Sequence, residues 1–189
     1  MRIGLFGGSF NPIHNAHVAL ARTICEQAGL DEVWFLVSPQ NPLKEQSTLL
    51  DENIRLDITR KALSLYPNLK ASDYEFHLDR PSYTWNTLQH LRQDYPQHDF
   101  FLIIGGDNWI MFDKWAHHED IIDTTEIIIY PREDSQINES ELPPTVHLVH
   151  TPEINITSTM IRKLIAEGES ISGYVPQNVE QTIIKSYRL

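Results

Sequence analysis

Short apolar runs alternate with amphipathic stretches along nearly the whole chain. Apolar runs bounded by glycine, proline or polar residues predict buried strands over residues 2–6, 33–37, 71–78, 100–104, 126–130 and 146–149. Between them, apolar positions recur at the spacing of one helix face and predict helices over residues 15–28, 52–65, 84–95, 158–167 and 179–187. Strands that alternate with helices pair in parallel through right-handed crossovers. The pattern therefore predicts an α/β fold, a doubly wound parallel sheet with helices on both faces.

The length of the chain fits one domain of this kind. Its 189 residues contain no internal repeat, low-complexity tract or linker, so we expect a single domain over residues 1–189. A Rossmann-like sheet binds ligands at the carboxyl ends of its strands, near the point where strand order reverses. No apolar run approaches the ~18 residues of a membrane span, and the first residues lack the pattern of a signal peptide. With Cys25 as its only cysteine, the chain is expected to be cytoplasmic, without a disulfide or a membrane partner.

The net charge limits the ways in which this chain can bind anions. It is formally −11, which argues against a nucleic-acid partner, because such partners need a basic face. A phosphorylated substrate would have to be bound locally, by helix N-termini, main-chain amides and a few basic side chains. Two segments of the sequence offer such groups.

The first segment runs from Gly7 to His17, at the junction between the first strand and the first helix. Its glycines allow close approach of the main chain to a ligand and backbone angles that other residues avoid. His14 and His17 are three positions apart, so in a helical turn they share one face near the positive end of the helix dipole. Two imidazoles there could donate hydrogen bonds to a reacting phosphoryl group.

Three other interpretations of this segment remain open at this point. The first is an ordinary turn with two surface histidines. The second is a zinc site, which is disfavoured because no third ligand lies nearby in the sequence. The third is a dinucleotide-binding oxidoreductase, which is disfavoured because Gly4, Gly7 and Gly8 do not have the G-x-G-x-x-G spacing.

The second segment, Asn155 to Arg162, has the composition of a capped helix start. Thr157 or Ser158 can cap the first free amides. Arg162 lies in the first turn, where it opposes the helix dipole unless an anion binds there. Amides, hydroxyls and a guanidinium could then converge on that anion. The alternative is a routine N-cap followed by a solvated arginine.

Together the two segments resemble the nucleotidyltransferase α/β-phosphodiesterase superfamily. The similarity lies in Gly-Gly-Ser-Phe-Asn-Pro-x-His-x-x-His over residues 7–17 and in Ile-Thr-Ser-Thr-Met-Ile-Arg over residues 156–162. The whole length is similar to one bacterial branch, the nicotinate mononucleotide adenylyltransferases. The resemblance implies a single nucleotidyltransferase domain that transfers the adenylyl group of ATP to nicotinate mononucleotide, giving deamido-NAD and pyrophosphate. It also implies Mg²⁺ as a cofactor, bound mainly through substrate phosphates with no dedicated protein ligands.

The resemblance assigns roles by position. His14, His17 and Arg162 would act on the reacting phosphates. The residues implied to bind ATP are Gly7, Gly8, Ser9, Phe10, Gly105, Asp107, Ser158 and Thr159. Those implied to bind the mononucleotide are Lys44, Thr84, Trp115 and Arg132. Some have plain alternatives, since Trp115 could be a packing residue, Thr84 a helix N-cap and Lys44 a solvated loop charge.

The sequence departs from the family pattern at three places. Ala16 stands where the family has glycine before the second histidine. Leu43 precedes Lys44 where many relatives have histidine, and Glu133-Asp134 follows Arg132 in place of Pro-Gly. The last two differences weaken the assignments of Lys44 and Arg132.

Some properties stay open at the level of sequence. The acceptor could instead be nicotinamide mononucleotide or phosphopantetheine, and a non-catalytic nucleotide sensor is a disfavoured alternative of another class. The oligomeric state is also open, a homo-oligomer included.

Overall fold

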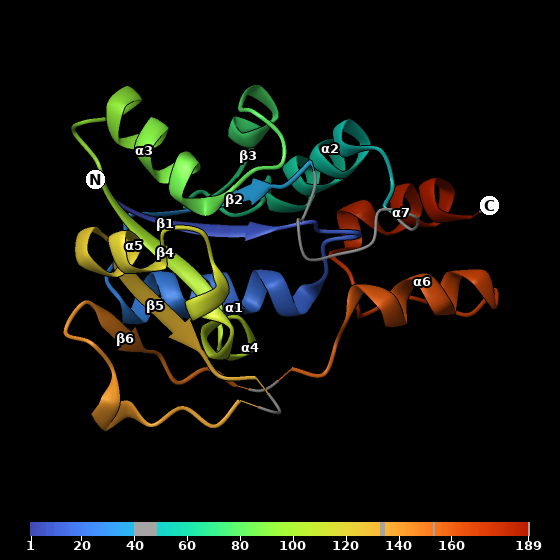
Figure 1. The fold of residues 1–189 in the computed structure, drawn as a ribbon. Helices are drawn as coiled ribbons and strands as arrows, with labels where there is room; N and C mark the ends of the chain where they lie inside the picture. Colours follow the sequence, from blue (N-terminus) through green and yellow to red (C-terminus); the bar gives the residue numbers. More distant parts are fainter. Residues whose placement is uncertain (40–48, 133–134, 153, 189) are drawn as a thin grey trace.

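The apolar runs form one six-stranded sheet in a computed structural model that describes residues 1–39, 49–132, 135–152 and 154–188. All of its strand pairs are parallel, in the order β3-β2-β1-β4-β5-β6 (Figure 1). The strands are β1 (Arg2–Gly8), β2 (Glu32–Val37), β3 (Leu69–Ser72), β4 (Asp99–Gly105), β5 (Glu126–Tyr130) and β6 (Val146–Leu148). Strand order reverses between β1 and β4, so the carboxyl ends of these two strands are where a ligand is expected.

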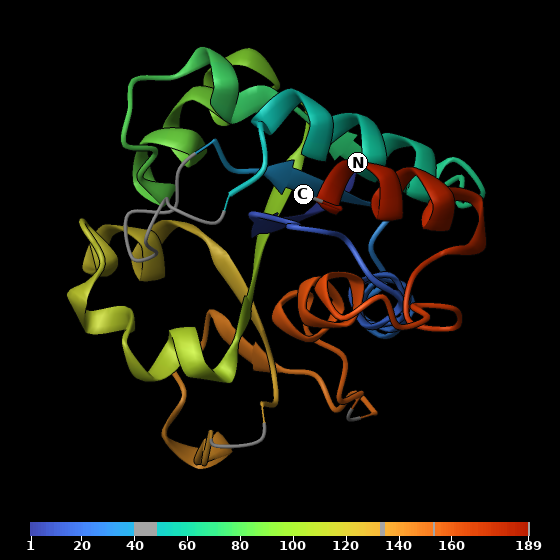
Figure 2. The ribbon, with the colours of Figure 1, turned by 90° about the vertical axis from the view of Figure 1, so that its right-hand side faces the viewer.

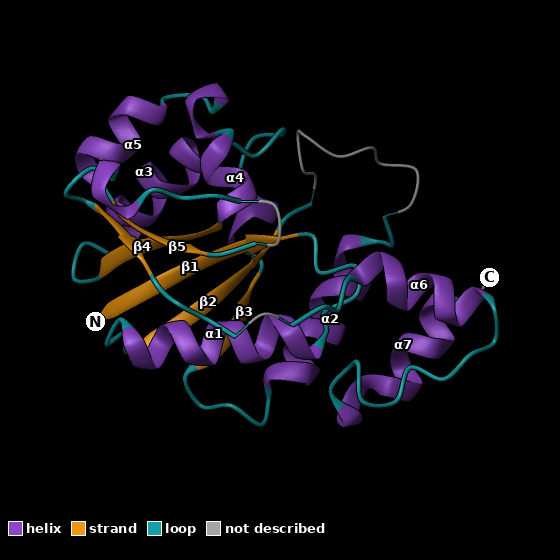
Figure 3. Ribbon diagram, turned by 90° about the horizontal axis from the view of Figure 1, so that it is seen from below, coloured by secondary structure: helices purple, strands orange, loops and turns teal. Residues whose placement is uncertain are grey.

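Helices cover both faces of the sheet, as predicted. The α-helices are α1 (Asn15–Gln27), α2 (Glu52–Leu63), α3 (Thr84–Asp94), α4 (Gly106–Ile110), α5 (His118–Thr124), α6 (Ser158–Ala166) and α7 (Glu180–Tyr187). The 3₁₀ turns are η2 (Tyr74–His77), η3 (Phe112–Lys114), η4 (Glu139–Glu141) and η5 (Gln177–Val179). Figure 3 shows α1 and α2 on one face and α3, α4 and α5 on the other, with α6 and α7 beyond the carboxyl ends of the strands.

Successive side chains of a strand point to opposite faces of the sheet, so the core consists of two clusters, one on each face of the sheet. Val33 and Phe35 of β2 belong to the cluster under α1, α2, α6 and α7. Leu36, between Phe35 and Val37, belongs to the cluster under α3 and α5. Buried apolar area of this extent is the main source of the stability of such a fold. No helix in the described ranges is long and apolar enough to cross a membrane.

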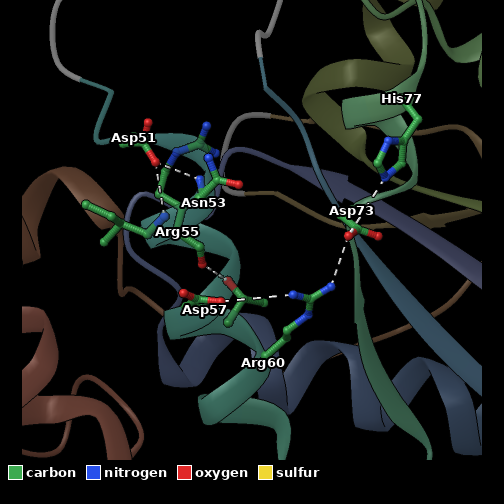
Figure 4. Close-up of polar contacts among 9 residues, drawn as sticks. Asp51, Asn53, Arg55, Asp57, Arg60, Asp73 and His77 are labelled. Atoms are coloured by element: carbon green, nitrogen blue, oxygen red, sulfur yellow. Dashed lines mark hydrogen bonds and ion pairs between the residues drawn. The ribbon is translucent and has the colours of Figure 1, made fainter.

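Polar contacts cap the start of α2 and tie its later part to the end of β3. The Asp51 carboxylate accepts hydrogen bonds from the main-chain amides of Asn53 and Ile54, at 2.9 and 3.4 Å. Farther along the helix, Arg60 donates to the Asp73 carboxylate, which follows β3, at 3.1 Å (Figure 4). Asp51 therefore supplies the N-cap that a helix start needs, and Arg60 ties α2 to the end of β3.

The structure corrects two predicted elements and adds two that were not predicted. The strand predicted over residues 71–78 is wrong beyond Ser72, because β3 runs from Leu69 to Ser72 and the chain then turns into η2. There the Ser72 hydroxyl accepts from the Tyr74 amide at 3.2 Å, a local bond that competes with the strand ladder. Helices α4 and α5 were not predicted, because they are too short for a hydrophobic period to stand out. The helix predicted over residues 179–187 begins as η5 and becomes α-helical at Glu180.

Candidate active site

A cavity of about 1000 Å³ opens at the carboxyl edge of the sheet, the edge that faces the viewer in Figure 2. Its wall combines the loop after β1, the start of α1, Asp107 of α4, the residues that follow β5, and the start of α6. The two sequence segments, whose Gly8 and Ser158 are 150 positions apart in the chain, therefore meet around one space. A parallel sheet explains the meeting, because the carboxyl ends of its strands share one edge.

The loop after β1 is shaped by one glycine and one phenylalanine. A Cβ atom on Gly8 would lie 2.9 Å from the Phe10 ring, so the loop has no room for a side chain there, whereas a Cβ on Gly7 would meet no atom within 4 Å. The left-handed backbone angle expected of the glycines belongs instead to Phe10, whose φ is 43°. That expectation was wrong because burial of the Phe10 ring, packed edge-on against Phe6, holds the backbone in this conformation.

The two histidines stack at the start of α1. Their ring centroids are 3.6 Å apart, and their planes are inclined by 19°. His14 is the N-cap residue and His17 is the third residue of the helix. The main-chain amide of His14 donates to Nδ1 of His17 at 3.3 Å, and so the proton of a neutral His17 ring is placed on Nε2. His17 is therefore a hydrogen-bond donor without being charged.

His14 is buried at the bottom of this stack. Only 4% of it is exposed, and its Nδ1 has no hydrogen-bond partner in the structure. Burial, together with the nearby positive charge of Arg132, lowers the pKa of the ring from 6.5 to about 3. The ring is therefore neutral in the folded protein at neutral pH.

Acid is expected to destabilise the ligand-free protein partly through His14. In the unfolded chain this ring takes up a proton below about pH 6.5, but in the folded protein it stays neutral down to about pH 3. Between these values, His14 lowers the free energy of unfolding by about 1.4 kcal/mol for each unit of pH decrease. Urea unfolding at pH 7 and pH 5 should show a smaller acid loss for His14→Asn than for the wild type. Equal losses in the two proteins would contradict this assignment.

The start of α6 is hydrogen-bonded to the first loop. Thr157 is its N-cap, and the Thr157 hydroxyl accepts from the Met160 amide at 3.1 Å. The Ser158 hydroxyl donates to the Pro12 carbonyl at 2.8 Å. Arg162 donates to the Asn11 carbonyl at 2.7 Å and to the Thr159 hydroxyl at 3.3 Å. Of the two capping residues that the sequence allowed, Thr157 is the cap, which leaves Ser158 and Arg162 to join the two helix starts.

Asp107 and Arg132 face each other across the cavity wall. The Asp107 carboxylate lies 3.9 Å from Nε of Arg132, and both side chains are about half exposed. A Cβ atom on Gly105 would collide with the Asp107 carboxylate and lie 3.2 Å from the Tyr130 ring. Glycine at 105 therefore leaves space for Asp107 to fold back over the end of β4. An exposed pair of this kind contributes little stability, and both groups stay accessible to a ligand.

The structure does not bring Thr84 and Trp115 into this cavity. Thr84 is the first residue of α3, and the N-cap is Tyr83, so the interpretation of Thr84 as a cap is wrong. Trp115 packs against Phe112 with 5.1 Å between ring centroids, and its indole N–H is buried without a hydrogen-bond partner. Lys44 lies outside the described residues.

Tyr130 lines the cavity, although sequence reasoning missed it. It ends β5, and its ring packs edge-on against Phe6 with 6.1 Å between centroids. Its position at the carboxyl end of a strand was a usable signal, because that edge binds ligands in such sheets. Among the described residues, no group of three or more His, Cys, Asp or Glu side chains is placed to hold a metal ion.

This sheet topology, with two helix starts meeting at the switch point, defines a Rossmann-like α/β protein. The family model described as cytidylyltransferase-like matches residues 5–164. Two relatives named "probable nicotinate-nucleotide adenylyltransferase" come from Bacteroides fragilis (strain YCH46) and Bacteroides thetaiotaomicron. The first is 47% identical over 97% of this chain and 92% of its own length. The second is 48% identical over 97% and 91%. The chain therefore belongs to the nicotinate-nucleotide adenylyltransferase family of cytidylyltransferase-like proteins.

Solved structures share the fold. The nicotinic acid mononucleotide adenylyltransferase of Plasmodium falciparum, complexed with NaAD, has a TM-score of 0.82 and 23% identity over 97% of this chain and 95% of its own. The same enzyme complexed with APC has a TM-score of 0.78 over 97% and 94%. These values confirm the predicted fold class.

Proposed function

We propose that this protein transfers the adenylyl group of ATP to nicotinate mononucleotide, giving deamido-NAD and pyrophosphate. The observation that carries the proposal is the meeting of two helix starts at one cavity, with His14 and His17 on one and Ser158, Thr159 and Arg162 on the other. Helix N-termini and their side-chain donors bind phosphate, which meets the requirement that an acidic chain concentrate its anion binding. The names of the two relatives, which are 47% and 48% identical over nearly the whole chain, support the choice of substrates.

The chemistry requires positioning and charge stabilisation. The 5′-phosphate of the mononucleotide attacks the α-phosphorus of ATP in line, a P–O bond forms, and the bond to the β-phosphate oxygen breaks to release pyrophosphate. The attacking oxygen is already anionic, so no general base is needed. In this proposal His17 donates from Nε2 to the α-phosphate, where charge develops, with His14 stacked behind it. Gly7, Gly8, Ser9 and Phe10 bind nucleotide through their main chain, with Gly105 and Asp107 at the adenosine ribose.

The leaving pyrophosphate is assigned to the start of α6. Ser158 and Thr159 are the first two residues of this helix, and Arg162 lies one turn later. A guanidinium in this place stabilises a triphosphate more than it stabilises the helix, because it opposes the helix dipole. Arg162 also donates to the Asn11 carbonyl, so the guanidinium is held in place at the start of the triphosphate site.

The acceptor is assigned to the side of the sheet that carries α3 and η3. There Thr84 and the buried, unpartnered indole N–H of Trp115 are the candidate contacts of the pyridine ring. Lys44 and Arg132 are the other two residues that we propose to contact the mononucleotide. Main-chain amides at the start of α3 are suited to the ring carboxylate, because a helix N-terminus favours an anion.

Magnesium fits this site as an ion held through substrate phosphates. Asp107 is the one carboxylate among the described residues that line the cavity, and it already lies beside Arg132. Mg²⁺ usually keeps several waters and binds through substrate phosphates with few protein carboxylates. When bound, it would neutralise charge on the triphosphate.

One assay tests the reaction and the acceptor together. Pyrophosphate release is measured with ATP, Mg²⁺ and one acceptor at a time: nicotinate mononucleotide, nicotinamide mononucleotide or phosphopantetheine. We expect the highest kcat/KM with nicotinate mononucleotide and loss of activity when EDTA removes Mg²⁺. Release only with phosphopantetheine would refute the acceptor, and release with none of the three would favour a nucleotide sensor.

A further inference from the structure

We propose that Arg55 and Tyr187, here called the loop clamp, are positioning residues that hold residues 9–11 in the conformation that binds ATP. Neither side chain lines the cavity, whereas Ser9 and Asn11 do. The inference rests on the proposed function, because it assigns the loop after β1 to ATP.

The loop clamp acts on the residues that follow the last hydrogen bonds between β1 and β2. The ladder between β1 and β2 runs as far as Gly8 opposite Val37, followed by one more bond from the Ser38 amide to the Gly8 carbonyl at 2.9 Å. Residues 9–11 lie past this point and have no neighbouring strand to fix them. Their geometry must therefore come from side chains of other elements.

Arg55 of α2 supplies the first of these side chains. It is 1% exposed, and its guanidinium donates to the main-chain carbonyls of Leu50, Ser9 and Ser38, at 2.8, 2.5 and 3.0 Å. Burial of a guanidinium is costly, and burial lowers the pKa of Arg55 from its ordinary range. Three carbonyls from three separate segments converge on one rigid group, which suits a planar fork of donors. Figure 4 shows Arg55 at the start of α2, beside Asp51.

Tyr187 of α7 supplies the second. Its hydroxyl donates to Oδ1 of Asn11 at 2.8 Å, and the Leu50 amide donates to the same oxygen at 3.2 Å. Burial raises the pKa of the Tyr187 hydroxyl, and the nearby charges of Arg55 and Arg162 lower it in part. The main chain of Asn11 also accepts from Arg162. Asn11 is therefore held twice, through its side chain by Tyr187 and through its main chain by the cavity-lining Arg162.

Loss of a clamp bond is expected to move the phosphate-binding main chain without removing any group that touches substrate. Small displacements of a binding loop reduce affinity and rate because the bound geometry is no longer preformed. The effect should fall on ATP and spare the mononucleotide, whose pyridine ring is assigned to contacts near α3 and η3, away from residues 9–11. A role in folding alone would lower the amount of active enzyme and leave both KM values unchanged.

Two variants with matched controls test the clamp. Tyr187→Phe removes one hydroxyl and should raise the KM for ATP about 3- to 10-fold, the scale of one hydrogen bond. Tyr74→Phe is its control, because the Tyr74 hydroxyl donates to Asp94 at 2.6 Å, away from the cavity. Arg55→Lys keeps the charge but loses the fork, and should raise the KM for ATP by at least ~10-fold. Its control is Arg92→Lys, since Arg92 bonds only to Thr124 and Thr125 among the described residues.

The wild type is assayed first, so that failure of the proposed function is seen separately as a lack of pyrophosphate release. With an active wild type, the clamp is supported when both clamp variants raise the KM for ATP and the KM for nicotinate mononucleotide stays within about twofold, a change of roughly 0.4 kcal/mol. It is overturned when Tyr187→Phe leaves the KM for ATP unchanged, or when the controls raise it equally. If Arg55→Lys does not fold, the KM for ATP of Tyr187→Phe alone decides whether the clamp proposal holds.

Discussion

Replacement of His17 by alanine is expected to lower kcat by at least about 10²-fold, the scale of one lost transition-state donor. The hydrogen bond from the His14 amide to Nδ1 places the ring proton on Nε2 and holds the ring in one orientation. Stacking on His14, at 3.6 Å between centroids, fixes the ring plane as well. A donor held in this way needs no reorganisation when charge develops on the α-phosphate, and this is why its loss should be large. Steady-state pyrophosphate release with saturating ATP and nicotinate mononucleotide measures the effect.

Two further variants separate the donor from the ring. His17→Gln keeps an N–H donor of similar reach and should recover part of the lost kcat. His90→Ala removes a helical histidine whose ring bonds only to the Asn86 carbonyl in the described structure, and should leave kcat unchanged. Near wild-type turnover by His17→Ala would rule out the assigned role, provided that thermal unfolding shows the variant to be folded.

The fold was largely predictable because its elements follow from hydrophobic period. In α1, Val18, Ala21, Ile24 and Cys25 are buried, which is the helical stripe that the sequence showed. Periodicity failed where an element is shorter than about two periods or is set by a polar contact. Helix α4 has five residues. Glu75, which the period placed in a strand, is instead buried in η2, where its carboxylate accepts from Ser38 and Thr87.

The site was predictable to a smaller extent. The meeting of residues 7–17 with residues 157–162 could be expected from motif chemistry and from the common edge of a parallel sheet. The burial of His14 and its lowered pKa could not, because the burial depends on tertiary packing, stacking on His17 included, and the pKa on that burial and on the position of Arg132. Arg55 was also invisible as a functional candidate. A single arginine in an amphipathic helix ordinarily extends into solvent, and only the tertiary structure brings three carbonyls to it.

The acidic net charge gives these local details their importance. At −11 the chain repels polyphosphate at long range. Binding must therefore come from short-range groups that are already in place: the amides at two helix starts, a donor imidazole and a few guanidinium groups. Ala16, where the family has glycine, also lines this cavity.

Replacement of Arg162 by methionine is therefore expected to lower kcat/KM for ATP by about 10²- to 10³-fold, the range for loss of an anchored donor to a transferring phosphoryl group. Arg162 lies on the cavity wall and is held by the Asn11 carbonyl and the Thr159 hydroxyl. Methionine keeps much of the length and apolar contact of the side chain, so the change should leave α6 folded. The measurement is the rate of pyrophosphate release at several ATP concentrations with nicotinate mononucleotide saturating.

Lys163→Met is the matched control. Lys163 is the next residue on α6, is largely exposed, and lies 3.9 Å from Glu167 in a surface ion pair. Lys163→Met therefore removes one positive charge from the same helix, one position away from Arg162. If general electrostatic attraction of ATP to α6 were the cause, the two variants would lose activity together, and the loss would diminish as salt is added. If a bidentate guanidinium is required, Lys163→Met should stay near the wild type and Arg162→Lys should recover only a small part of the loss, because an ammonium group cannot make the two parallel bonds. Full recovery by Arg162→Lys would reduce the role of Arg162 to its charge.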